Sequence, residues 1–265
     1  MRWCSAAVVV LVGAARIGAQ SAPEPGAYAV LGLDGVTLAT RVHVSGGDVG
    51  ANRGSVAVGA RARVDGTIAG DTIRIHRGAR ASDLLCRLVI GPLRYTCGGL
   101  SGAVVDLATL PLVQVAAGTA DVRIPARARG APLAPAAYGD ARVGRKGELL
   151  LAGGTYAFRA ITLGPGARLL CTAACRVEVE TAVVLGSRAR LGVAPPLDAH
   201  AVRVDIEGKG RTGGLSAASR TTVDASIYTP QGRVRLGEGG RYTGGFLGRS
   251  VNVGARARVT AASVL

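Results

Sequence analysis

Apolar residues recur along the chain at short, regular intervals, a pattern that predicts small β-strands joined by tight corners. One seven-residue pattern keeps returning. Its first position is aliphatic, its second is usually glycine, its third and fourth vary, its fifth is small, its sixth is arginine and its seventh is usually aliphatic. Two adjacent pairs of copies begin 17 residues apart, which is about one coil of a parallel β-helix. The clear copies occupy residues 58–64, 163–169, 185–191, 236–242 and 253–259, and weaker copies begin at 75, 143 and 215.

A repeat this small cannot bury its apolar face alone, so successive coils must stack on one another. Within 176–180 and 202–207, β-branched residues alternate with charged ones, which predicts strands with an apolar face inward and a charged face outward. No segment of the mature chain has a helical pattern approaching three turns. The expected fold class is all-β, a right-handed parallel β-helix or β-solenoid.

The first 19 residues have the features of a secretory signal peptide. Arg2 supplies a positive charge, residues 5–15 are apolar, and small residues at 18 and 19 offer a cleavage point. The apolar run is shorter than the ~20 residues that span a bilayer, so we expect no membrane span after cleavage. Residues 26–265 are then expected to form a single β-solenoid domain, with irregular segments near 84–135 and 191–201.

Four cysteines remain after the signal peptide, and an even number in an exported protein favours disulfides. Four cysteines allow three pairings, and the short separations favour Cys86 with Cys97 and Cys171 with Cys175. Metal binding and buried free thiols are the alternatives. Neither pair has the two-residue spacing of a zinc knuckle and no histidine lies nearby in the sequence, so we predict two disulfides.

Motifs of known catalytic chemistry are missing from the sequence. His43, His76 and His200 are widely separated and belong to no metal-binding or nucleophile motif. No nucleophile elbow, zinc-protease motif or phosphate-binding loop occurs. We therefore predict no catalytic residue, no metal and no cofactor.

Outward carboxylates are the one pattern that would suit an enzyme. Glu178 and Glu180 share a strand face, as do Asp205 and Glu207, and stacked coils would place such groups ~5 Å apart. This spacing is compatible with the paired acid and base of a polysaccharide lyase or hydrolase. Outward charges also keep an exposed sheet soluble and block edge pairing. We favour the second reading, because no long loops are predicted to wall a cleft over this face.

The net charge of +15 comes almost wholly from arginine, since Lys146 and Lys209 are the only lysines. If the coils stack in register, the arginines of the repeated pattern form a file along one edge. Like charges ~5 Å apart repel by roughly 1 kcal/mol per pair in water, so such a file is favourable mainly when it faces an anion. Solvated arginines produced by a GC-rich genome are the alternative. The predicted anion-binding residues are Arg63, Arg80, Arg168, Arg190, Arg220, Arg241 and Arg258.

Residues 154–158, 226–230 and 244–248, each preceding a new aliphatic strand, resemble exported bacterial β-helix proteins built from phrases of the form Leu-Gly-Asn-Asn-Ala-Arg-Leu, and more distantly the bactofilins. Residues 28–31 and 44–50 resemble the opening of bacterial ice-binding β-helix proteins. These resemblances imply a β-helix and supply no catalytic residues. The chain departs from the pattern at its corners, where Arg, Pro, Ser and Ala replace the usual Asn and make the corners more basic.

Together these features predict a non-enzymatic β-helix protein that is secreted, periplasmic or on the bacterial cell surface. Its role would be structural or adhesive at the cell envelope, with a basic edge presented to an anionic polysaccharide or cell-surface polymer. Nucleic acid is not an expected partner of an exported chain. Ice binding would require threonines at fixed positions in successive coils, which the sequence lacks.

Two alternatives remain open at this point. The last repeat, 253–265, runs to the terminus without a polar cap, and an uncapped solenoid end exposes strands. That would favour a homo-oligomer joined through solenoid ends, as in a bactofilin-like polymer. The other alternative is a polysaccharide lyase or hydrolase on the same scaffold.

Overall fold

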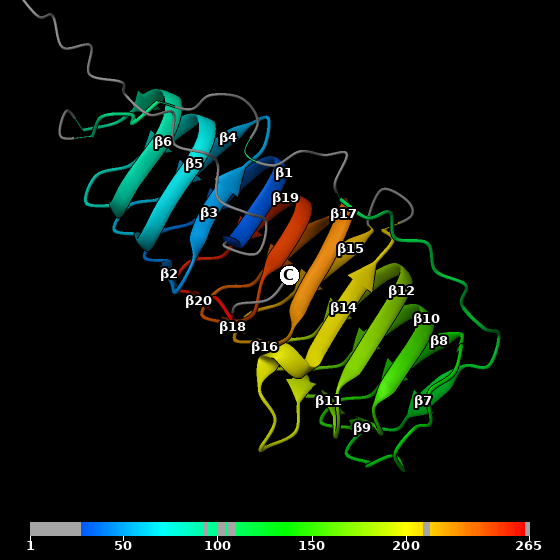
Figure 1. Ribbon diagram of the computed structural model, residues 1–265. Helices are drawn as coiled ribbons and strands as arrows, with labels where there is room; N and C mark the ends of the chain where they lie inside the picture. The colour runs from blue at the N-terminus through cyan, green and yellow to red at the C-terminus, as the bar shows by residue number, and fades with distance from the viewer. Residues whose placement is uncertain (1–27, 93–94, 100–103, 105–109, 209–212, 263–265) are drawn as a thin grey trace, which may run out of the picture.

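The chain folds into a parallel β-solenoid of about 11 coils, seen in a computed structural model, and this confirms the predicted β-helix class (Figure 1). The structure describes residues 28–92, 95–99, 104, 110–208 and 213–262, so the predicted signal peptide lies outside the described residues. The strands are β1 (Tyr28–Leu38), β2 (His43–Ser45), β3 (Asp48–Ala51), β4 (Ser55–Val58), β5 (Arg63–Ile75), β6 (Arg80–Ile90), β7 (Val122–Ile124), β8 (Asp140–Val143), β9 (Glu148–Leu151), β10 (Gly154–Leu163), β11 (Arg168–Cys171), β12 (Cys175–Leu185), β13 (Arg190–Val193), β14 (Val202–Ile206), β15 (Gly214–Ala217), β16 (Thr222–Asp224), β17 (Ser226–Leu236), β18 (Arg241–Thr243), β19 (Phe246–Val253) and β20 (Arg258–Thr260), with one 3-10 turn, η3 (Ala199–Ala201).

Each regular coil crosses three faces of the solenoid, and long strands bend from one face to the next. In the coil of β10 and β11, residues 154–158 lie on the first face, 160–163 on the second and 168–171 on the third. We call the first face the strap face, because the segment defined below as the strap packs on it, and we call the second the open face. Every strand pairing in the described part of the chain is parallel, so equivalent positions of successive coils stack in columns ~4.8 Å apart.

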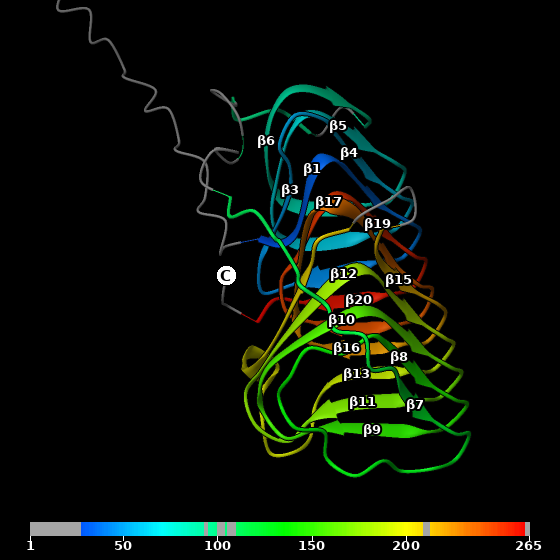
Figure 2. The same cartoon turned by 90° about the vertical axis from the view of Figure 1, so that its right-hand side faces the viewer.

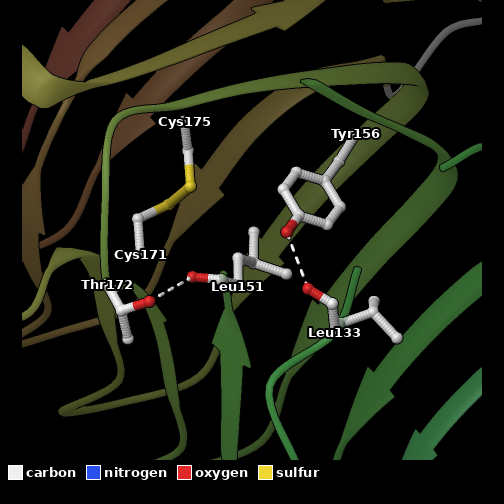
Figure 3. The surroundings of a disulfide bond; sticks show 6 residues. All are labelled: Leu133, Leu151, Tyr156, Cys171, Thr172 and Cys175. Carbon is white, nitrogen blue, oxygen red and sulfur yellow. Dashed lines mark hydrogen bonds between the residues drawn. A yellow bond between two sulfur atoms is a disulfide. The ribbon is translucent and has the colours of Figure 1, made fainter. Parts of the chain in front are cut away.

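The interior is filled by columns of aliphatic side chains, as the alternating pattern predicts. Tyr156, Phe158, Tyr242 and Phe246 are the largest side chains inside it. The hydroxyl of Tyr156 donates a hydrogen bond of 2.7 Å to the carbonyl of Leu133, so the polar end of this buried ring is satisfied (Figure 3). The interior is therefore mainly apolar, and the buried hydroxyls of Thr221 and Tyr242 are hydrogen-bonded to each other.

The coils do not stack in the order of the sequence (Figures 1 and 2). The C-terminal coil, β19 and β20, pairs on one side with β17 and β18 and on the other with the N-terminal strands β1 and β2. Val251, for example, is flanked by Val234 and Val36. The prediction of an uncapped end at 253–265 is wrong for its described part, 253–262. Because every coil offers the same kind of parallel edge, the N-terminal coils cover the strands that the C-terminal coil would otherwise expose.

Between β6, at one end of the solenoid, and β7, at the other, residues 110–121 run along the outside of the coils (Figures 1 and 2). We call residues 104 and 110–121 the strap. Val104 is buried against an outward-facing apolar row on the strap face, which includes Leu31 and Leu247. The hydroxyl of Tyr228 donates a 2.6 Å hydrogen bond to the carbonyl of Pro111. The strap thus covers apolar side chains that a bare solenoid would expose. Within the segment expected to be irregular, 84–90 belong to β6 and 122–124 to β7.

Both predicted disulfides form. Cys86 and Cys97, with Cα atoms 5.2 Å apart, tie the chain that follows β6 back onto that terminal strand. Cys171 and Cys175, 6.1 Å apart, close the corner between β11 and β12 (Figure 3). Next to this corner the Thr172 hydroxyl donates to the carbonyl of Leu151 in the preceding coil. The cysteines therefore fix one end of the solenoid and one of its turns.

Candidate anion-binding edge

The corner between the open face and the third face has an unusual backbone. The residue two positions after the glycine of the repeat, which is the fourth position of the pattern, has a positive φ in every regular coil. In seven coils this residue is basic and not glycine, with φ between 56° and 62°. These seven are the only non-glycine residues with positive φ in the described part of the chain: Arg41, Arg61, Arg127, Lys146, Arg188, Arg220 and Arg256. Glycine or asparagine adopts this conformation with less strain.

Hydrogen bonds between coils hold these corner residues in one column, which we call the corner file. In every coil of the file except that of Gly78, the backbone N–H of the file residue donates to a carbonyl in the neighbouring coil, that of the residue just before the file residue there, at 2.8–3.3 Å. The ladder also crosses the junction between the two ends of the chain, from Arg256 to Thr40. In stacking order the file reads Arg127, Lys146, Gly166, Arg188, Arg220, Gly239, Arg256, Arg41, Arg61 and Gly78.

The glycine of the repeated pattern permits this close stacking. A Cβ on Gly186 would lie 2.8 Å from the backbone of Gly164 in the preceding coil, and a Cβ on Gly254 would lie 2.6 Å from the backbone of Glu238. Side chains at these positions would push the corners apart. The glycine is thus a packing requirement of the corner, and the basic residue two positions later is not.

A second column, the strand file, runs parallel to the first, two residues further along each coil. The predicted arginine register is correct for six of the seven residues, because Arg168 pairs with Arg190, Arg241 with Arg258, and Arg63 with Arg80. In stacking order the file reads Arg129, Glu148, Arg168, Arg190, Thr222, Arg241, Arg258, His43, Arg63 and Arg80.

Arg220 is the exception. It lies in the corner file with φ 58°, and Thr222 occupies the strand-file position between Arg190 and Arg241. The repeat of this coil begins at Ala217, not at Leu215, because an alanine stands where other copies have a larger aliphatic residue. The shift of two residues moves Arg220 from the sixth position of the pattern to the fourth.

The corner file was missed from the sequence, although a signal for it was present. The fourth position of the pattern is Asn in the related phrase, and Asn is one of the few side chains that tolerate a left-handed backbone. Arg61, Arg188 and Arg256 occupy this position in the clearest copies. A basic residue that replaces Asn at a left-handed corner marks a second file, and we name the two files together the basic edge.

Carboxylates neutralise only part of the basic edge. Glu148 pairs with Arg129 at 2.9 Å, Asp224 with Arg190 at 3.2 Å, and Glu238 with Arg256. Asp65 contacts both His43 and Arg63. The hydrogen bond from His43 is the main cause, and that from Arg63 the second, of a lowered pKa of the Asp65 carboxyl group. Among the described residues, no ion pair is found for Arg41, Arg61, Arg80, Arg127, Lys146, Arg188, Arg220, Arg241 and Arg258.

A hollow of about 870 Å³ lies near the middle of the basic edge. Arg188, Arg220, Arg241 and Arg256 line it, together with the small Gly239. The hollow lies where both files have a small residue in place of a long side chain. The corner file has Gly239 in one coil, and the strand file has Thr222 in the neighbouring coil. It is therefore a local opening in a continuous positively charged surface.

The outward carboxylates have partners that give them structural roles. Asp205 is only 1% exposed and receives hydrogen bonds of 2.8 Å from both Arg176 and Arg203. Glu178 lies beside it in register and pairs with Arg176 at 3.1 Å. Glu207 accepts a hydrogen bond from the backbone of the strap at Val115. These contacts hold Glu178, Asp205 and the strap in place on the strap face.

Two further observations concern the described part of the chain as a whole. No helix within it is long and apolar enough to cross a membrane. No cluster of three or more His, Cys, Asp or Glu side chains suited to a metal ion lies among the same residues.

No protein-family model matches the sequence, and no curated protein matches it. Among solved structures, the chain is similar to an ice-binding protein from an Antarctic bacterium, Flavobacteriaceae, at 11% identity and a TM-score of 0.34. The match covers 89% of this chain and 80% of that one. A likeness at this level carries no argument about function.

Proposed function

We propose that this protein is a secreted, non-enzymatic β-solenoid with a structural or adhesive role at the bacterial envelope, and that its basic edge binds an acidic polysaccharide. The single observation that supports the proposal most is the set of seven basic residues in left-handed corners. An L-amino acid in this conformation costs about 1–2 kcal/mol compared with a right-handed backbone. Stability alone would favour glycine or asparagine at these corners.

The electrostatics support the same conclusion. Neighbouring positions of each file are ~4.8 Å apart, so adjacent guanidinium groups repel by up to about 0.8 kcal/mol in water. Backbone strain and charge repulsion thus coincide at the same residues. Unfavourable features that persist together on a surface are typical of binding sites. A polymer with repeated negative charges would relieve the repulsion along the whole edge.

A comparison of two variants with equal charge loss tests the proposal. The edge variant combines Arg188→Asn, Arg220→Asn, Arg241→Gln and Arg258→Gln, where Asn at the corners keeps the left-handed backbone. The control variant changes four exposed arginines elsewhere to Gln: Arg53, Arg74, Arg233 and Arg235.

Binding of dextran sulfate and polygalacturonate to the chain beginning at residue 20 would be measured by calorimetry at 0.15 M salt. If each edge arginine contributes about 0.5 kcal/mol, as an exposed ion pair does, the edge variant loses ~2 kcal/mol, or about thirty-fold in affinity. The control should lose less, because none of its arginines belongs to the basic edge. Equal losses in both variants, or no binding of either polymer to the unmodified chain, would contradict the proposal.

The alternatives receive less support from the structure. Ice binding would favour a regular threonine column, but the exposed positions of the open face change from coil to coil, with Thr162, Val184, Ser216 and Arg235 in one column. Growth through the solenoid ends is opposed at the β7 end by prolines, which cannot donate to a new strand. These prolines are Pro125, Pro132 and Pro135.

A further inference from the structure

The hollow in the basic edge differs from the rest of the edge in its shape and in its donors. In the corner file, Gly239 stands between Arg220 and Arg256, so one guanidinium is missing while those on either side remain. A Cβ added at Gly239 would meet only the side-chain Cγ of Arg220, at 3.8 Å, so the space beside this glycine is open. The opening is therefore made by the sequence and is surrounded by positive charge.

The donors around the hollow come from several coils. Arg188, Arg220 and Arg241 have no ion pair with a described residue, whereas Arg256 is paired with Glu238, which also lines the hollow. Taken together, these five side chains carry a net positive charge. The four arginines belong to four successive coils, so the donors are spread along the hollow and do not come from one planar guanidinium.

Hydroxyl groups complete the lining. Ser187 and Ser219 lie on the wall, with their oxygens 3.4 Å apart, and Thr222 occupies the strand-file position. The hydroxyl of Thr221 is not available, because it is buried and bonded to the carbonyl of Ala218 and to the hydroxyl of Tyr242. Short hydroxyls beside several guanidinium groups are suited to an anion with many oxygen acceptors.

We propose that the hollow binds a tetrahedral oxyanion ester, a sulfate or a phosphate, carried by one sugar unit of the polymer. A carboxylate has two oxygens in one plane and is satisfied by one bidentate arginine. A sulfate or phosphate ester has three free oxygens that accept from several directions, which matches donors on neighbouring coils. The volume lies within the range of small-molecule sites, so the sugar fits together with its charged group.

This inference rests on the proposed function, because the hollow is one part of the basic edge. The proposed function requires only that the basic edge attracts polyanions. The further inference is that the hollow selects sulfate or phosphate esters over carboxylates.

The test fills the hollow while adding positive charge. Gly239→Arg restores the corner file at this coil, and the side chain occupies the space that the ester would use. Gly78→Arg is the matched control, because Gly78 is also a corner-file glycine with a positive φ, but it lies at the far end of the edge. Both variants gain one charge and the same kind of backbone strain. Circular dichroism and thermal unfolding would verify that each variant is folded.

Each protein would be titrated with three oligosaccharides of equal length and charge, one sulfated, one phosphorylated and one carboxylated. We expect the unmodified chain to bind a sulfated or phosphorylated ligand about ten-fold more tightly than the carboxylated one, which corresponds to ~1.4 kcal/mol. Gly239→Arg should abolish this preference, and Gly78→Arg should keep it. Preference for one of the two esters identifies which ester the site takes.

If Gly239→Arg strengthens binding of all three ligands as Gly78→Arg does, the hollow is not a binding site, although the basic edge still is. The same conclusion follows if the unmodified chain shows no preference among the three. If no oligosaccharide binds to any of the proteins, the proposed function fails together with the inference.

Discussion

Replacement of one corner arginine by asparagine should make the protein more stable. Arg41 is the most informative position, because Arg256 and Arg61 flank it in the corner file and all three have positive φ. Asn tolerates the left-handed backbone better than Arg, by about 0.7 kcal/mol if its several-fold enrichment there is read as a free energy. Removal of the charge relieves repulsion from two neighbours.

The size of the repulsion follows from the coil spacing. Two unit charges ~5 Å apart interact by about 0.8 kcal/mol in water, and a Debye length of ~8 Å at 0.15 M salt reduces this to roughly 0.4 kcal/mol for each neighbour. Arg41→Asn should therefore raise the free energy of unfolding by about 1.5 kcal/mol at 0.15 M salt. At 1 M salt, where the charges are screened, only the ~0.7 kcal/mol from the backbone should remain.

Urea denaturation at the two salt concentrations measures both contributions. Arg74→Asn is the control, because Arg74 lies in β5 on the open face, where Asn brings no backbone benefit and disfavours the strand. A loss of stability in Arg41→Asn would refute the reasoning, because a corner arginine would then stabilise the coil. The basic edge would then have a structural explanation and would no longer require a ligand.

Three further outcomes can be measured. Double replacement of Cys86 and Cys97 by Ala, which opens a link spanning 11 residues, should cost about 3 kcal/mol, with loss of hydrogen-exchange protection confined to β6. Tyr228→Phe removes the hydrogen bond to Pro111, should cost about 1 kcal/mol, and should speed proteolysis of the strap. Burial raises the pKa of Tyr228 from 10.0 to about 12, so the folded state keeps a proton that the unfolded chain releases. The free energy of unfolding should therefore fall between about pH 10 and pH 12. Tyr228→Phe should make that fall smaller.

Much of the fold follows from local sequence. The repeated aliphatic positions fill the interior, the glycine allows the corners to approach, and the alternating pattern sends the charges outward. The pairing of Cys86 with Cys97 and of Cys171 with Cys175 follows from short separations. The predicted members of the strand file follow from the fixed place of arginine in the clear repeats, and among these seven residues only Arg220 is misplaced, because its repeat has an alanine in place of the larger aliphatic residue.

The candidate site was only partly predictable. Its strand file is visible in the spacing of the repeats, but the corner file is recognised only when the left-handed backbone at the fourth position of the repeat is known. The hollow depends on two absences, at Gly239 and Thr222, which lie on different coils and become neighbours only through stacking. The hollow therefore has no signal within a single repeat, whereas the corner file has one at the fourth position, where a basic residue replaces the Asn of the related phrase.

The sequence by itself therefore determined the coil, its inward and outward faces, and its disulfides, because each depends on residues close together in the chain. Only the tertiary structure decided which coil lies beside which. Parallel edges of similar coils are interchangeable in their hydrogen bonding, so no local signal places β1 on β19. The pairing of the N-terminal coils with the C-terminal one is a long-range contact, and it joins both files into one edge.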